Sequence, residues 1–198
     1  MPPKTLTLPD DFVLSLTGVR IEPLNLGHHD DLVQACQDGA LWTLNYANVP
    51  SPDKMADYIM LGLNTADRIA FAVIDERIGK AIGTTSFHDI LPACLRLEIG
   101  YTWYAQSVWR THINTTCKFL LLQYAFEQLG YRTVGLRASL DNVRSQTAIE
   151  RLGAKKDGII RGHRIYKDGK ISDTVMYSMT ANEWQDAKPN LLSRLHHD

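Results

Sequence analysis

A chain of 198 residues with 44% apolar content is long enough for one domain with a substantial core and too short for two full domains. Its 21 basic and 22 acidic residues give a formal net charge of -1 without a dense cationic run, so nucleic acid and anionic membranes are poor default partners. No apolar run approaches the roughly 20 residues of a membrane span, and the N-terminus lacks a signal-peptide core. We expect a soluble cytoplasmic protein with a single domain over residues 1–198.

The first third of the chain predicts a short β region followed by two helices. Three prolines make residues 1–10 a loose arm, and glycine breaks the β-branched segment 12–24 into one or two strands. Apolar spacing predicts a helix over 30–41. A second helix should begin at Ser51, as N-cap, with Met55, Tyr58, Ile59 and Leu63 on its apolar face. The connection between these helices, 41–50, is unusually aromatic and amide-rich.

Strands dominate the next part of the chain. Segments 69–74, 80–90 and 97–104 are rich in β-branched and aromatic residues and are separated by short turns, which is typical of an antiparallel meander. An apolar helix should follow over 113–129, with two apolar stripes and therefore burial on two sides. Because a helix joins segment 97–104 to the next strand, 133–138, these two strands should run parallel in a right-handed crossover.

The C-terminal part predicts a capped helix, a hairpin and a terminal helix. Asn142 can cap a helix with Ala148, Ile149 and Leu152 on its inner face, which ends at Gly153. Segments 159–166 and 171–179 flank Lys167-Asp168-Gly169-Lys170, a strong hairpin signal. Thr180 and Glu183 form a capping-box pattern that opens a short terminal helix, within an extension over 181–198.

The loop before the central helix is a candidate anion site. Residues 109–115 are basic, hydroxyl-bearing and amide-bearing, and they lead into a helix N-terminus, whose free N–H groups and dipole favour an anion such as pyrophosphate. Taken alone this signal is weak, because most strand-turn-helix units bind nothing.

The cysteines do not indicate a metal site. Cys36, Cys94 and Cys117 are odd in number and widely spaced, which fits neither a disulfide framework nor a pair of metal ligands. We interpret them as small apolar fillers and expect no metal.

Several motifs in a fixed order sharpen this reading. They are Leu97-Glu98-Ile99-Gly100-Tyr101-Thr102-Trp103, Arg110-Thr111 with Asn114-Thr115, Asn142-Val143-Arg144-Ser145, and Ala148-Ile149-Glu150-Arg151-Leu152-Gly153-Ala154. With the element order, they resemble the RimJ/RimL-type branch of the GNAT superfamily, which includes ribosomal-protein N-terminal acetyltransferases. The resemblance covers nearly the whole chain. It implies an α/β (α+β) GNAT fold: a mixed, mostly antiparallel sheet with one splayed parallel strand pair, flanked by helices.

The resemblance also implies an acetyl-CoA site and the residues that form it. The cofactor would lie where segments 97–104 and 133–138 splay apart, with pantetheine amides on the first strand and pyrophosphate on the loop before the helix. The implied cofactor residues are Tyr101, Thr102, Trp103, Arg110, Thr111, His112, Ile113, Asn114, Thr115, Asn142 and Ser145. Asn142 can act as helix cap, cofactor contact or both.

Two departures from the family pattern affect the phosphate loop. Arg110 and His112 stand near places where the superfamily usually has glycine, and histidine tolerates positive φ less well than glycine. Thr116 stands where branch members often have an acidic residue.

Two residues are candidates for the chemistry. Glu98 could act through water as the base; the alternative is an ordinary strand residue that is solvated or paired with an arginine. Ser145 could hydrogen-bond the CoA sulfur, or be satisfied locally in the first helical turn. Many GNAT members have a tyrosine acid where Ile149 stands here.

The acceptor is predicted only as a class. Trp42, Asn45, Tyr46 and His88 could wall its pocket, or be ordinary core and surface residues. The main hypothesis is an N-acetyltransferase acting on a peptide α-amine or small amino compound. The alternative is a non-catalytic acyl-CoA-binding or interaction module. A homodimer stays open.

Overall fold

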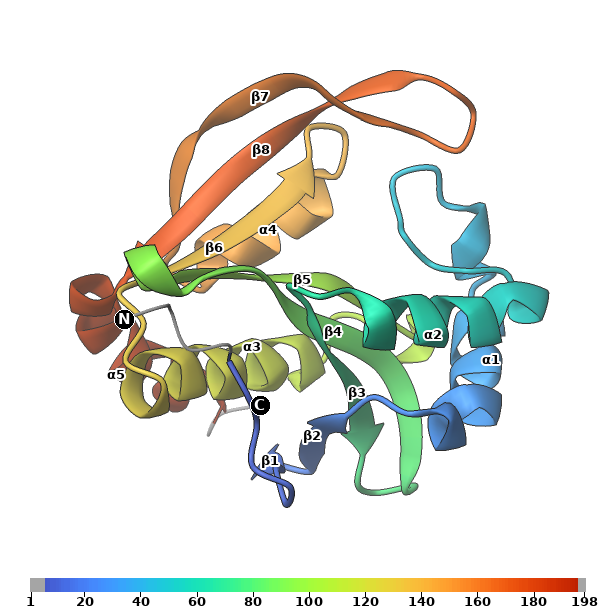
Figure 1. Ribbon diagram of the computed structural model, residues 1–198, viewed down its shortest axis with the longest axis horizontal. Helices are drawn as coiled ribbons and strands as arrows, with labels where there is room; N and C mark the ends of the chain where they lie inside the picture. The colour runs from blue at the N-terminus through green and yellow to red at the C-terminus, as the bar shows by residue number, and fades with distance from the viewer. Residues whose placement is uncertain (1–5, 196–198) are drawn as a thin grey trace.

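A single sheet of eight strands runs through the computed structural model, which describes residues 6–195 (Figure 1). The strands are β1 (Leu14–Leu16), β2 (Val19–Pro23), β3 (Ile69–Asp75), β4 (Lys80–Leu91), β5 (Arg96–Tyr104), β6 (Thr133–Ser139), β7 (Lys155–Ile165) and β8 (Ile171–Thr180). Their order is β1-β2-β3-β4-β5-β6-β8-β7, and every neighbouring pair except β5 and β6 is antiparallel. The predicted sheet, with its one parallel pair, is confirmed.

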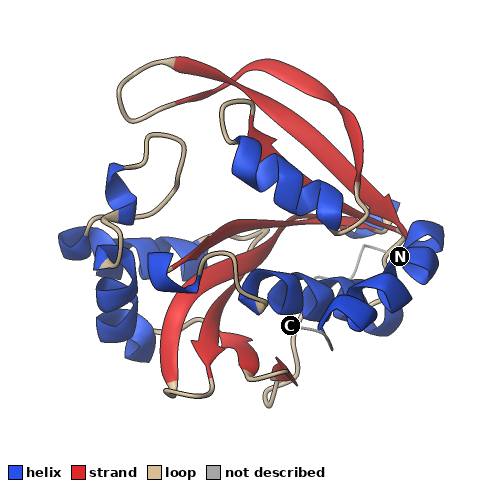
Figure 2. Cartoon of the chain, turned by 180° about the vertical axis from the view of Figure 1, so that it is seen from behind, coloured by secondary structure: helices blue, strands red, loops and turns tan. Residues whose placement is uncertain are grey.

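Within residues 6–195 the chain forms five α-helices, and helices lie on both sides of the sheet (Figure 2). They are α1 (His29–Gln37), α2 (Met55–Asn64), α3 (Ile113–Gln123), α4 (Val143–Arg151) and α5 (Ala181–Leu195). None of the helices within residues 6–195 is both long and apolar enough to span a membrane.

Two apolar cores lie on opposite faces of the sheet. Along β3, Phe71 and Val73 enter the core that contains α3 and α5, while Ala70, Ala72 and Ile74 enter the core that contains α1 and α2. This alternation follows from the two-residue period of a strand. Because β3 is covered on both faces, its residues from Ala70 to Asp75 are all buried.

The central helix is buried on two sides, as predicted. All seven residues from Thr116 to Leu122 are buried. The α-helix ends at Gln123 and continues as a π-helical turn, Tyr124–Gln128, so the predicted range of 113–129 holds although its last part is wider than an α-helix.

The other predicted helices differ from the structure in their ends or exposure. The helix expected over 30–41 ends at Gln37, because Gly39 and Ala40 both take left-handed φ values, 86° and 48°. Ser51 precedes a short helical turn, Pro52–Lys54, but its side chain makes no capping hydrogen bond. Leu63 is 45% exposed and does not belong to the buried face of α2.

The predictions for the two ends of the chain can also be compared with the structure. Residues 1–5 of the expected arm lie outside the described residues, whereas Leu6 and Leu8 pack against the core that contains α3. The capping box is confirmed, since the Thr180 N–H donates to Glu183 at 2.8 Å and the Glu183 N–H donates to the Thr180 hydroxyl at 3.4 Å. It opens a terminal helix of 15 residues, longer than expected.

The parallel pair β5 and β6 stays together for only three residue pairs. Arg96, Leu97 and Glu98 face Thr133, Val134 and Gly135, and beyond that point the strands separate. β6 remains paired with β8 along its full length, while β5 remains with β4. The predicted splay is therefore present, and it leaves the backbone of β5 beyond Glu98 open on the β6 side.

Docking of α5 should contribute strongly to stability. Trp184 is 3% exposed, contacts Phe119 and Phe126 with ring centroids 5.6 and 5.8 Å away, and donates to Glu127 at 2.8 Å. We expect Trp184→Ala to lower the free energy of unfolding by about 3–5 kcal/mol in a urea titration. Gln185→Ala, on the exposed side of the same helix, should change it by less than about 0.5 kcal/mol. Similar losses for the two variants would contradict this packing.

Candidate active site

A cavity of about 1730 Å³ lies where β5 and β6 separate. Its walls come from the 41–49 connection, β5, the loop before α3, the first turns of α3, β6 and α4. Thirteen residues expected at the site line it: Asn45, Tyr46, His88, Tyr101, Thr102, Trp103, Arg110, Thr111, His112, Asn114, Thr115, Asn142 and Ser145. The lining does not include Trp42, Glu98 or Ile113.

The start of α3 forms one end of this cavity. The Thr111 hydroxyl accepts from the Ile113 N–H at 3.4 Å and donates to the Val108 carbonyl at 2.7 Å, which orders the turn into the helix. Asn114 and Thr115 lie in the first turn and line the cavity, so helix N–H groups without an intrahelical partner are at its wall.

Only one of the two non-glycine positions in this loop takes a left-handed conformation. Arg110 has φ of 64°, which costs a side-chain-bearing residue about 1 kcal/mol or more. His112 has φ of -63° and needs no glycine; its ring nitrogen Nε2 lies 3.1 Å from the Thr17 carbonyl. The Thr116 hydroxyl lies 3.0 Å from that of Thr17. Strain in the phosphate loop is therefore confined to Arg110.

Several arginines contribute to the wall of the cavity. Arg110, Arg144, Arg151 and Arg194 all line it. The Arg144 guanidinium lies 3.6 Å from the centroid of Trp109, a cation–π contact that orients it, and Arg194 donates to the Arg151 carbonyl at 2.8 Å. Together with the helix terminus, these four cations suit a ligand with several phosphate groups.

A β-bulge shapes the strand that forms the floor. Ser86 faces Gly100 and Thr84 faces Trp103, so Tyr101 and Thr102 on β5 oppose one residue on β4. Tyr101 takes φ of 51°, and its ring lies under the Arg68 guanidinium at 3.9 Å. The bulge turns the β5 backbone locally, next to the point where β5 and β6 separate.

Glu98 lies outside the cavity lining and is held by arginines. Its carboxylate accepts from Arg137 Nε at 2.8 Å and lies 3.5 Å from Arg96, while Arg137 also pairs with Asp89. Burial raises the pKa of Glu98, and Arg96 and Arg164 oppose that rise. Glu98 is thus paired with arginines, as the alternative interpretation of this residue expected. Its role as a base stays a prediction.

Of this cluster, His88 and Arg137 reach the cavity wall. Burial, followed by the charge of Arg137, lowers the pKa of His88 to about 3, so the ring is neutral at pH 7. Its Nδ1 lies 3.4 Å from the Arg137 guanidinium, a donor, and 3.3 Å from the Asp89 carboxylate, an acceptor. The ring fits closely because a side chain at Gly100 would lie 2.2 Å from Nε2.

The same cluster has the composition of a metal site, but its cation is an arginine. Ligand atoms of His88, Asp89 and Glu98 all lie within 4.8 Å of one another. Arg137 contacts each of the three, so its guanidinium takes the position that an ion would need. Of the cysteines, Cys36 and Cys117 are buried and Cys94 is exposed, so the filler interpretation is wrong for Cys94.

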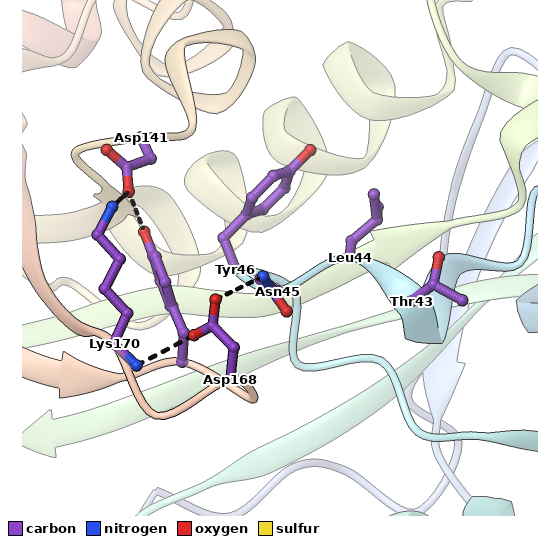
Figure 3. A pocket seen from close by; sticks show the side chains of 8 residues that line it. Thr43, Leu44, Asn45, Tyr46, Asp141, Asp168 and Lys170 are labelled. Carbon is purple, nitrogen blue, oxygen red and sulfur yellow. Dashed lines mark hydrogen bonds and ion pairs between the residues drawn. The ribbon is translucent and has the colours of Figure 1, made fainter.

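The 41–50 connection and the β7–β8 hairpin meet beside the cavity, and we call this contact the clasp. Lys167 Nζ donates to the carbonyls of Trp42 and Val49, at 2.6 and 3.2 Å, and Asn45 donates to Asp168 at 2.9 Å. Figure 3 shows Asn45 and Asp168 facing each other across the gap. Trp42 thus contributes its carbonyl to the clasp, while its side chain packs against the core that contains α1 and α2.

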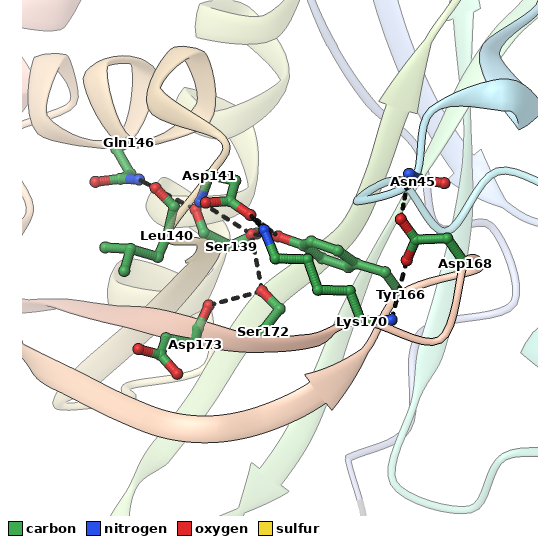
Figure 4. A network of polar contacts seen from close by, with 10 residues as sticks. All are labelled: Asn45, Ser139, Leu140, Asp141, Gln146, Tyr166, Asp168, Lys170, Ser172 and Asp173. Carbon is green, nitrogen blue, oxygen red and sulfur yellow. Dashed lines mark hydrogen bonds and ion pairs between the residues drawn. The ribbon is translucent and has the colours of Figure 1, made fainter.

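A polar network ties the hairpin to the end of β6 (Figure 4). The Tyr166 hydroxyl contacts that of Ser139 and donates to Asp141 at 3.1 Å, and Lys170 lies 3.5 Å from the same carboxylate. Asp141, Tyr166 and Lys170 of this network, with Asn45 and Asp168 of the clasp, line a second pocket of about 330 Å³. The clasp therefore forms one wall of a polar entrance.

The sequence reasoning did not identify several lining residues. Arg144 and Arg151 lie two helical turns apart, a spacing that could have indicated one basic face. Lys118 is a charged residue within the apolar part of α3, and this could also have indicated a residue at the site. Arg194 and Tyr166 reach the cavity only through the tertiary fold.

Comparison with known proteins shows which family has this architecture. Residues 19–155 match the family model described as "Acetyltransferase (GNAT) domain". Over 110 residues the chain is 33% identical to "Putative ribosomal N-acetyltransferase YdaF" of Bacillus subtilis, covering 56% of this chain and 59% of that protein.

Two solved structures extend the likeness to most of the chain. A GCN5-related N-acetyltransferase from Brucella melitensis superposes with a TM-score of 0.85 and 30% identity, covering 94% of this chain and 86% of its own. Mycobacterium smegmatis RimJ, in complex with CoA-disulfide, gives 0.77 with 15% identity, covering 89% and 88%; this likeness concerns the fold.

The neutral state of His88 predicts how stability depends on pH. In the unfolded chain the ring would have a pKa of about 6.5, so between that pH and about 3 the unfolded state binds one more proton than the folded state. We expect acidification from pH 7 to pH 5 to lower the free energy of unfolding, and to do so less in His88→Gln. His29→Gln, with a more exposed ring, is the matched control. The histidine ring resonances can be followed by NMR as the pH is changed. A pKa near 6.5 for His88 in the folded protein would contradict this prediction.

Proposed function

Since this chain belongs to the GNAT acetyltransferase family, we propose that it transfers the acetyl group of acetyl-CoA to the α-amine of a peptide or of a small amino compound. The observation that carries this proposal is the cavity between β5 and β6, whose wall includes the start of α3, several arginines and polar side chains such as Asn45 and Tyr46. A donor with several negative charges requires the cationic part of the wall. An uncharged amine acceptor requires the polar part.

The cationic end suits the phosphates of acetyl-CoA. Arg110, Arg144, Arg151 and Arg194, with the first turn of α3, offer charge and N–H donors to pyrophosphate and to a further phosphate. The backbone of β5 next to Tyr101 lacks a β6 partner and can pair with the amides of the pantetheine arm. In this arrangement Asn142 caps α4 through the Ser145 N–H at 3.1 Å, and the Ser145 hydroxyl is available to the donor.

The acceptor end is polar but offers no strong base at the cavity wall. His88 is neutral with a pKa near 3, and Glu98 is paired with Arg137. An acceptor that is already neutral fits this end best. A peptide α-amine has a pKa of about 7.7–8.0 against about 10.4 for a lysine side chain, so far more of it is uncharged at pH 7.

The name of the Bacillus subtilis relative suggests ribosomal proteins as acceptors. An unfolded N-terminal segment could enter between the clasp and His88, past Asn45 and Tyr46. Ribosomal acceptors would place the reaction in the cytoplasm. The net charge of -1 supplies no long-range field for a strongly cationic partner, so recognition would rest on contacts at the entrance.

Binding of the donor should depend on Arg110. We expect acetyl-CoA to bind with a micromolar or lower Kd in calorimetry, and Arg110→Ala to weaken binding about tenfold because one charged contact to phosphate is lost. The effect should shrink at high salt, since Arg110 is exposed. Lys80→Ala removes an equal charge at the far β3–β4 turn and should leave the Kd unchanged. No binding by the wild type at any salt concentration would remove the proposal.

The choice of acceptor can be tested with matched peptides. One peptide has a free N-terminus and no lysine, and the other is N-blocked with one internal lysine. We expect the first to be acetylated at least about tenfold faster at pH 7, from the difference in uncharged amine. Thiol release is the measurement. A faster second peptide would contradict the α-amine preference, and binding without turnover on any amine would indicate a non-catalytic module.

A further inference from the structure

Lys118 is a buried lysine on the wall of the cavity. It lies on α3, one and a half turns beyond the start of the helix, and only 6% of the residue is exposed. Its Nζ donates to the Thr102 hydroxyl at 2.6 Å, and that hydroxyl lies 2.8 Å from that of Thr85. Within residues 6–195 no carboxylate forms an ion pair with it.

An ammonium in this position is unusual on energetic grounds. Burying an unpaired charge costs several kcal/mol, and lysine is almost never fully buried without a partner. A single hydroxyl satisfies one of the three N–H donors of Lys118 and carries no compensating charge. Because the side chain faces the cavity, the missing partner is best sought in the ligand rather than in the protein.

The position of Lys118 indicates which part of the ligand it meets. It lies five residues, about 7.5 Å along the axis, beyond the first residue of α3, and so away from the expected phosphates. Its partner Thr102 belongs to the bulge of β5, four residues beyond the last pair with β6. Its charge also contributes to the lowered pKa of His88, so it is near the acceptor end. Lys118 therefore lies between donor and acceptor.

We propose that Lys118 is the acid that protonates the departing sulfur of CoA, an inference that rests on the proposed acetyl transfer. The neutral amine attacks the acetyl carbonyl carbon, the C–N bond forms, and the C–S bond breaks with its electron pair on sulfur. The Lys118 ammonium gives a proton to that sulfur. The surplus proton on the new amide nitrogen leaves through water and restores the ammonium, so no net proton is consumed.

The electrostatics of the site support this role. Burial lowers the pKa of Lys118 to about 8, close to the value of about 8.5 for a thiol, so proton transfer between the two is nearly balanced. The titratable groups around it on β4, β5 and α3 are His88, Tyr104 and Cys117. His88 is neutral at pH 7, and burial raises the pKa of both Tyr104 and Cys117. None of these groups offers Lys118 a negative charge at pH 7.

The ultraviolet absorbance of the thiolate in bound CoA gives a test that does not depend on turnover. In the wild type the ammonium should hold the thiol pKa low, and Lys118→Met should raise it by about one to three units. Lys118→Arg keeps the charge but releases its proton poorly, so the thiol pKa should stay low while kcat falls. We expect kcat to fall about a hundredfold in Lys118→Met, with less than about a threefold change in the Kd for CoA.

The controls separate this inference from its premise. Lys80→Met, at the far turn, should change neither the thiol pKa nor kcat. Methionine leaves no unpaired charge at position 118, and thermal unfolding checks that the variant is folded. An unchanged thiol pKa, or a weaker Kd with unchanged kcat, would overturn the role of Lys118 while the acetyltransferase proposal stands. A wild type that binds no CoA would instead remove the premise.

Discussion

The brief pairing of β5 with β6 is the constraint on which the rest of this structure depends. A parallel pair that ends after three residues leaves backbone N–H and C=O groups on both strands without their usual partners. β6 turns away with β8, and β5 turns away with β4, so the sheet opens at its middle rather than at an edge. The junction itself is tight, since a side chain at Gly135 would lie 2.8 Å from Glu98 and from Arg96. The cavity exists because β5 and β6 pair only at this junction and separate beyond it.

The charges around this opening form three separate groups. Arginines and the α3 terminus occupy one end, and Arg137 with its two carboxylates locks the other. Lys118 lies between them with no carboxylate partner in the described part of the chain. The two ends differ in kind: the cations of the first are open to a ligand, whereas the charges of the second satisfy one another. A net charge near zero thus conceals an uneven distribution of charge around the cavity.

Local patterns were sufficient to predict most of the fold, whereas the expected position of the acetyl-CoA site came from the family resemblance. Strand alternation, the two stripes of α3 and the Asn142 cap are set by neighbours in the chain, and each is confirmed by the structure. The positive φ of Arg110 and the arginine pairing of Glu98 depend on contacts between distant segments, which no local pattern records. Arg194 shows the limit most clearly, because it reaches the cavity only after α5 has docked through Trp184.

The clasp joins two segments that are more than 110 residues apart in the chain. One ammonium, that of Lys167, holds two carbonyls of the facing connection, so the reach of the hairpin and the length of the connection must match. An insertion in either segment would move its contact atoms out of hydrogen-bond range unless the other segment changed as well. Across related sequences, these two loops should therefore vary in length together, as a matched pair. The shape of the polar entrance would then diverge in discrete steps, while the part of the cavity built on α3 and β5 stays the same.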